Sequence, residues 1–236
     1  MMANLEQIIA NKNASDTQWQ HQQQAERENV TEMQNCGIEM ITTDPTQYLR
    51  YLTIQGDNPG YSAGNVAIVL AGLSGATVFG TRERWQSLGR TVLEDQQELG
   101  VKIFARDPRT KAYALTDAYD ISQTQGREIK RRPLREDTEE MASALSTLLN
   151  YSKAKLSVDK DMTVPAFFDE GSRELVINSE FPDEEAFASI AAEVALTRYH
   201  DKGYNRDYSW ARYELDAQSV SYILCQIGRA SCRESV

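Results

Sequence analysis

Histidine and cysteine are both scarce in this sequence. Its 236 residues include two histidines, His21 and His200, and three cysteines, Cys36, Cys225 and Cys232. Three scattered cysteines provide neither a disulfide framework nor a cysteine-based zinc site, and they suit a reducing compartment. We therefore expect a cytoplasmic protein with no bound cofactor.

Segments for export or membrane insertion are also missing. The N-terminus has no charged segment followed by an apolar core, so it does not resemble a signal peptide. A long uncharged stretch, residues 62–81, contains four glycines and several polar residues. This composition predicts a buried helix, a turn and a strand, and it excludes a membrane-spanning helix there.

Positive charge is in deficit across the whole chain, whose formal net charge is −10. Nucleic-acid binding is therefore not the default expectation for the molecule as a whole. The exception is residues 127–135, which hold five basic residues and one acidic residue. A basic run of this kind acts either as a charged linker or as an electrostatic arm.

Periodicity and composition divide residues 1–226 into four parts. Residues 1–35 predict a polar N-terminal helix, and residues 36–126 a small domain of helices with a β-hairpin. The basic linker covers residues 127–135. Residues 136–226 predict a helix, a β-hairpin and two further helices. The expected fold class is α+β, with no internal repeat.

The last ten residues, 227–236, need separate treatment. Their sequence, IGRASCRESV, resembles the translation of a common sequencing-adapter oligonucleotide. We therefore treat them as an artefact that is not part of the fold. The natural chain is then expected to continue beyond Gln226.

Four short motifs occur in a characteristic order: residues 61–65 (YSAGN), 85–90 (WQSLGR), 119–124 (YDISQT) and 219–225 (SVSYILC). Through them, residues 18–226 resemble the ArdC/LtrC-type antirestriction and conjugation-associated proteins of plasmids and integrative elements. The resemblance implies a single-stranded-DNA-binding domain over residues 36–126. It also implies a zincin-like metallopeptidase domain over residues 136–226.

The peptidase motif of that family, HExxH, is incomplete here. Zinc binding requires two imidazoles at positions i and i+4 of one helix, with a glutamate to polarise the bound water. The matching positions hold Ala192, Glu193 and Leu196, so only the glutamate is present. We expect no catalytic residue and no peptidase activity, with Glu193 as a vestige. A weak alternative is a mixed metal site of Glu193 and His200 with Glu214 or Asp216.

Single-stranded DNA is recognised by a basic groove combined with aromatic platforms on which bases stack. In residues 36–126 the candidates are Tyr61, Asn65, Arg82, Arg84, Trp85, Arg90, Lys102, Arg106, Arg109 and Lys111. For Tyr61 and Trp85, packing in the core is an equally good interpretation.

One departure weakens the DNA hypothesis. Where the family has a Lys- and Gly-rich turn, residues 94–98 (EDQQE) carry three acids and no base, which repel phosphate. Two alternatives therefore stay open: an unconventional zinc metallopeptidase, and an acidic scaffold for a protein partner in the second half. The leading interpretation is a single-stranded-DNA-binding accessory protein of a mobile element, with a role in antirestriction and a dead peptidase-like domain.

Overall fold

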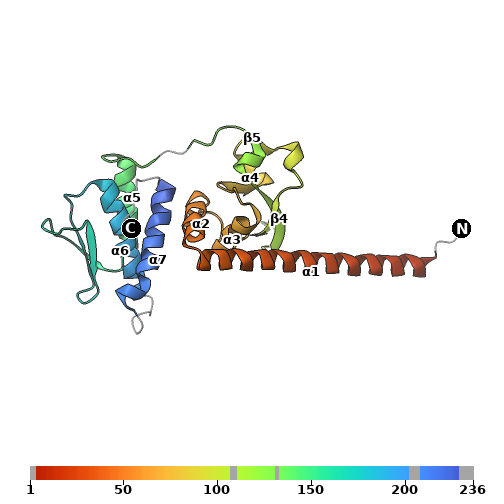
Figure 1. Cartoon of the computed structure of the whole chain (residues 1–236), viewed down its shortest axis with the longest axis horizontal. Coiled ribbons are helices and arrows are strands. Elements are labelled where there is room, and N and C mark those ends of the chain that lie inside the picture. The colour runs from red at the N-terminus through yellow and green to blue at the C-terminus, as the bar shows by residue number, and fades with distance from the viewer. Residues whose placement is uncertain (1–3, 107–110, 131–132, 202–207, 229–236) are drawn as a thin grey trace. The chain divides into compact units, whose positions relative to one another are not determined.

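The computed structural model describes residues 4–106, 111–130, 133–201 and 208–228 (Figure 1). The chain forms two compact units. The first comprises residues up to 51 together with 60–127, and the second comprises 52–59 together with 128 onwards. No helix in the described ranges is both long and apolar enough to cross a bilayer.

Three helices begin the chain. They are α1 (Leu5–Thr43), α2 (Pro45–Asp57) and α3 (Ala63–Gly72). The expected polar N-terminal helix is thus longer than predicted, because α1 runs unbroken to Thr43 (Figure 1). Its C-terminal half packs against α3, where Gly37 allows a close approach: a Cβ there would lie 2.1 Å from the Ala67 carbonyl oxygen. Helix α2 begins at Pro45 as the sequence predicts.

A three-stranded antiparallel sheet completes the core of the first unit. Its strands are β1 (Phe79–Thr81), β3 (Val101–Arg106) and β4 (Tyr113–Asp120), in the order β1-β4-β3. The smaller elements are α4 (Arg82–Ser87), β2 (Arg90–Val92), β5 (Thr124–Gly126) and two 3₁₀ turns, Glu94–Gln96 and Ile121–Gln123. Strand β2 pairs with β5 in a separate two-stranded ribbon.

The sheet departs from the sequence prediction in three ways. The first strand begins at Phe79 instead of Thr77, because the Thr77 amide and hydroxyl both donate to the Asp120 carboxylate. The returning strand of the hairpin is longer than the expected 112–115 and continues to Asp120. The ribbon of β2 and β5 was not predicted, since each strand has only three residues. The expected turn at 107–110 lies outside the described residues.

The second unit contains α5 (Glu139–Tyr151), β6 (Lys155–Val158), β7 (Ala166–Asp169), β8 (Glu174–Ile177), α6 (Asp183–Asp201) and α7 (Trp210–Gly228). The predicted helix, hairpin, helix and helix are all present. Strand β6 is an addition that pairs in parallel with β8 on the side opposite β7. Mixed helices and small sheets make the fold α+β, as expected.

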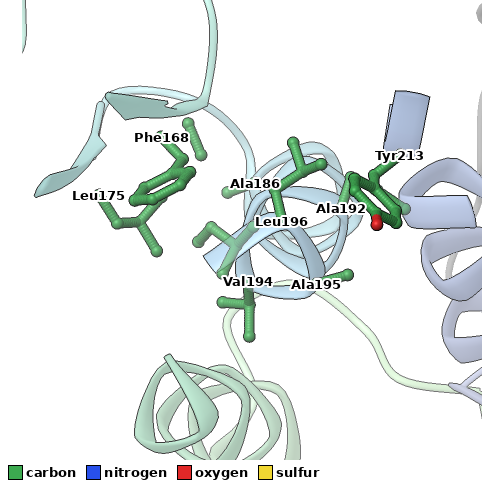
Figure 2. Close-up of a cluster of buried hydrophobic side chains, with 11 residues drawn as sticks. Phe168, Leu175, Ala186, Ala192, Val194, Ala195, Leu196 and Tyr213 are labelled. Atoms are coloured by element: carbon green, nitrogen blue, oxygen red, sulfur yellow. The ribbon is translucent and has the colours of Figure 1, made fainter. Parts of the chain in front are cut away.

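Helix α6 lies at the centre of this second core. Figure 2 shows it between Phe168 and Leu175 of the sheet on one side and Tyr213 of α7 on the other. Because small and branched residues occupy several sides of α6, sheet and helices both pack closely against it.

Candidate functional site

The positions where an HExxH helix carries its two histidines are part of the hydrophobic core. Ala192 is 3% exposed and Leu196 is 2% exposed, and both belong to the cluster around α6 (Figure 2). Neither side chain has a donor atom for a metal. Among the described residues, no group of three or more His, Cys, Asp or Glu side chains is placed to hold a metal ion.

Glu193 connects α6 to the edge strand β7. Its Oε2 accepts a hydrogen bond from the Phe168 amide at 2.9 Å. Burial raises the pKa of Glu193 to about 6, and the hydrogen bond from Phe168 opposes that rise. The carboxyl group therefore has a structural partner, and it occupies the place on β7 where another strand would otherwise pair.

His200, the other metal candidate, lies among aromatic rings. Its ring meets Phe168 edge-on at 5.6 Å between centroids and Tyr208 at 5.0 Å. Burial raises the pKa of Tyr208 to about 12, and the charges of Glu170 and Glu193 add to this rise. His200 also lies in the last turn of α6, where a basic residue suits the helix dipole.

In the first unit, the structure overturns the hypothesis that Trp85 is a stacking platform. Trp85 is fully buried at 0% exposure, and its indole Nε1 donates to the Tyr119 carbonyl oxygen at 3.0 Å. Neither face of the ring is open to a base, so Trp85 is a core residue.

Asn65 and Arg90 are likewise engaged inside the unit. The Asn65 amide is 6% exposed and bonds both backbone groups of Phe104, donating to its oxygen at 2.7 Å and accepting from its nitrogen at 3.0 Å. It thus fixes the outer edge of β3. The Arg90 guanidinium donates to Thr124 Oγ1 and to the carbonyl oxygens of Thr124, Arg127 and Ile121, which fastens β2 to β5. Most hydrogen-bonding groups of these two side chains are therefore engaged within the unit, which makes them poor candidates for binding DNA.

Tyr61, Arg82 and Arg84 gather at one end of the sheet. The half-buried Tyr61 ring lies 4.4 Å from the ring of Phe79, and the Arg84 guanidinium lies 5.3 Å above it. Burial raises the pKa of Tyr61. Arg82 is exposed and lies over Tyr119, with its Nη2 at 3.5 Å from the Tyr119 hydroxyl oxygen.

The two faces of β3 and β4 differ sharply. Val101, Ile103 and Ala118 point into the core and are 7%, 0% and 0% exposed. The strand register pairs the alternate residues on the opposite face: Lys102 with Asp117, Phe104 with Leu115, and Arg106 with Tyr113. All six of these residues are half-buried or exposed. This open face is the candidate nucleic-acid interface.

The end of the open face nearest the hairpin turn carries exposed basic and aromatic groups. Tyr113 is 62% exposed, and its partner Arg106 is exposed as well. Arg106 Nε donates to the Lys111 carbonyl oxygen at 3.2 Å, and Arg27 of α1 donates to the Tyr113 carbonyl oxygen at 2.9 Å. Tyr113, Arg106 and the Arg27 guanidinium thus lie close together here, while Arg109 lies outside the described residues.

The acidic segment lies at the other end of the same face. Glu94, Asp95 and Glu98 are exposed, and the loop that carries them covers Tyr119, whose hydroxyl donates to the Gln97 carbonyl oxygen at 2.8 Å. Tyr113 and Tyr119 are six positions apart on β4, which corresponds to about 20 Å. Repulsion by the acids therefore acts more strongly near Arg82 than near Arg106.

Comparison with known proteins gives a fold likeness. No family model matches the chain, and no curated protein matches it in sequence. The similar solved structures include two of the antirestriction protein ArdC from plasmid R388. The metal-free form has a TM-score of 0.40 and 14% identity over 69% of this chain and 66% of its own. The Mn(II)-bound form has a TM-score of 0.43 and 17% identity over 77% of this chain and 80% of its own. In fold, the chain resembles ArdC.

Two residues at the hairpin end of the sheet were missed in the sequence. Tyr113 and Arg27 were not among the candidates, although the alternation Lys102, Phe104, Arg106 already indicates a polar and aromatic strand face. Pairing in the hairpin extends that face to Tyr113. Arg27 had no sequence signal, because it reaches the hairpin only through the packing of α1.

Proposed function

We propose that the chain binds single-stranded DNA, without sequence preference, on the open face of β3 and β4, centred on Tyr113 and Arg106. The observation that carries the proposal is the exposure of Tyr113, 62%, beside its exposed strand partner Arg106, with the Arg27 guanidinium on the Tyr113 carbonyl oxygen. An exposed ring provides a face on which any base stacks, and neighbouring cations attract the phosphates.

Charge within the first unit supports this choice. The chain as a whole carries −10, but the first unit holds 11 Lys and Arg against 14 Asp and Glu, and its residues 60–127 hold eight against seven. The sheet is therefore far less repulsive to DNA than the net charge suggests. Lys102 contributes little, because it pairs with Asp117 at 3.3 Å.

The biological role that follows is that of an accessory protein of a plasmid or integrative conjugative element, with a part in antirestriction. Support comes from the four motifs shared with the ArdC/LtrC type. In this proposal the second unit is a peptidase-like domain without catalysis, since Ala192 and Leu196 replace the two zinc ligands.

The test is a fluorescence-anisotropy titration of a labelled oligothymidylate of about twenty nucleotides, at about 50 and 200 mM salt. We expect binding that weakens with salt. Tyr113→Ala should weaken it by about 1–3 kcal/mol, the value of one stacked base. Tyr113→Phe keeps the ring and should bind like the wild type.

A matched control comes from the second unit. Tyr151 is 63% exposed, almost the same as Tyr113, so Tyr151→Ala removes an equally exposed ring elsewhere. It should leave the affinity unchanged. Absence of binding at the lower salt concentration, or equal losses from Tyr113→Ala and Tyr151→Ala, would contradict the proposal.

A further inference from the structure

The second unit has an apolar groove along three of its helices. Its volume is about 850 Å³, and its floor includes Ala144 and Leu148 of α5, Phe187, Ala191 and Val194 of α6, and Leu224 of α7. These side chains belong to no site described above. A groove this long and apolar suits the face of another helix.

The two ends of the groove carry opposite charges. Helices α5 and α6 run in the same direction: the Asp137 amide donates to Asp183 Oδ2 at one end, and the Lys153 amide donates to Thr197 Oγ1 at the other. Glu139 and Glu140 therefore line the end where both helices begin. Arg198 lines the end where they finish. An occupant should be basic at the first end and acidic at the second.

The N-terminal part of α1, residues 5–22, is the matching element of the first unit. All of these residues are exposed, including four large apolar side chains: Leu5 at 69%, Ile8 at 55%, Ile9 at 53% and Trp19 at 62%. Spacings of three and four residues place these side chains on one face together with Lys12. In Figure 1 this part of α1 projects beyond the other elements of its unit. We call residues 5–22 the arm.

The arm needs a packing partner. A helical segment without tertiary contacts is marginal in water, and most of the stability of protein helices comes from burying an apolar face. Its charges also match the groove. With Leu5, Ile8 and Ile9 on the groove floor, Lys12 lies toward Glu139 and Glu140, and Glu6 lies toward Arg198. The arm then runs antiparallel to α5 and α6, which is favourable for the helix dipoles.

We propose that the arm of one copy of the chain docks into the α5–α6–α7 groove of a second copy, and that the exchange is reciprocal. Each copy carries one arm and one groove, so two identical interfaces close a dimer with twofold symmetry. The proposal is independent of DNA binding, which uses the open face of β3 and β4.

Sedimentation equilibrium of the full chain tests the proposal. We expect a dimer at micromolar concentrations. The arm variant Ile8→Glu/Ile9→Glu and the groove variant Thr147→Arg should each raise the dissociation constant by about tenfold or more. All three altered side chains are exposed, so the fold should tolerate the changes, and circular dichroism checks this. Leu99→Glu, at a residue 57% exposed outside arm and groove, should have no effect.

Charge reversal tests the pairing itself. Lys12→Glu and Glu140→Lys should each weaken the dimer, and the two changes in one chain should restore it. A mixture of the arm variant and the groove variant should form heterodimers, because one intact arm still meets one intact groove. A chain that stays monomeric at about 100 µM, or a dimer indifferent to both variants, overturns the proposal. A monomer in which both variants change the fluorescence of Trp19 also overturns it, since the arm then occupies the groove of its own chain.

Discussion

Burial destabilises the ionised form of Glu193. The carboxyl group is half-buried between α6 and β7, and burial raises its pKa from 4.5 to about 6. Between these two values the folded state binds more protons than the unfolded state. The stability that protonated Glu193 contributes is present below about pH 4.5 and is lost as the pH rises through about 6. The loss is about 2 kcal/mol at most.

Replacement of Glu193 by glutamine should remove this pH dependence. The glutamine side-chain oxygen still accepts from the Phe168 amide but carries no charge. We expect Glu193→Gln to gain about 2 kcal/mol relative to the wild type between pH 4.5 and 7. Urea unfolding at several pH values measures the difference. Glu185→Gln, at an exposed position on the same helix, controls for the loss of a charge. If the stability difference between Glu193→Gln and the wild type does not change with pH, or decreases as the pH rises, the burial argument is contradicted.

The sequence identified the kinds of residues in the candidate site better than it identified their exposure. Trp85 and Tyr113 lie in segments with similar basic neighbours, yet Trp85 is 0% exposed and Tyr113 is 62% exposed. Burial of Trp85 depends on β4, whose Tyr119 carbonyl accepts from its indole. That partner is 34 positions away, and no local pattern indicates it. The lack of the two histidines at positions 192 and 196, in contrast, could be read directly from the sequence, because it depends on residue identity alone.

At the scale of elements, local signals were accurate and long-range pairing was not. The sequence predicted the starts of α2 and α4, because Pro45 and the capping residue Thr81 act on their own turns; Thr81 Oγ1 accepts from the Arg84 amide at 3.3 Å. Strand β6 was missed. Its residues, Lys155–Val158, pair with Glu174–Ile177 in parallel, and a parallel partner leaves no turn signal in the sequence.

Lys111, two residues before the returning strand β4, offers a test of the hairpin. Its φ angle is +60°, the left-handed region where a Cβ is unfavourable and glycine is favoured. We expect Lys111→Gly to be more stable than Lys111→Ala by about 1 kcal/mol. Both variants lose the same charge, so their affinities for DNA should fall equally, by a small amount.

Thermal unfolding and the anisotropy titration measure the two effects separately. Ala154→Gly is the control. The backbone at Ala154 does not have a positive φ angle, so this variant shows how exchanging alanine for glycine changes stability on an unstrained backbone. Equal stabilities of the glycine and alanine variants would show that the backbone at position 111 is not strained. A large difference in their affinities would show that the hairpin conformation, and not the charge, governs binding.

At the scale of the whole molecule, the proposed DNA binding has to be a local property, because the chain carries a net charge of −10. Screening by salt makes local binding feasible, because charges more than about 10 Å apart interact weakly at 0.1 M salt. The acids that matter are then the three on the open-face side, Glu94, Asp95 and Glu98. The acids of the second unit contribute most of the net charge, so they provide the comparison.

A comparison of two triple variants with the same net charge tests this locality. The local variant is Glu94→Gln, Asp95→Asn and Glu98→Gln. The remote variant, named for its distance in the sequence, is Glu136→Gln, Glu185→Gln and Asp216→Asn. All six carboxyl groups are on exposed residues. At low salt, the local variant should bind single-stranded DNA severalfold more tightly than the wild type, and the remote variant should bind about as the wild type does. The gain should shrink as salt rises, since screening removes the repulsion that the acids exert. Equal gains from both variants would mean that the net charge controls binding, and the open face would then have no special role.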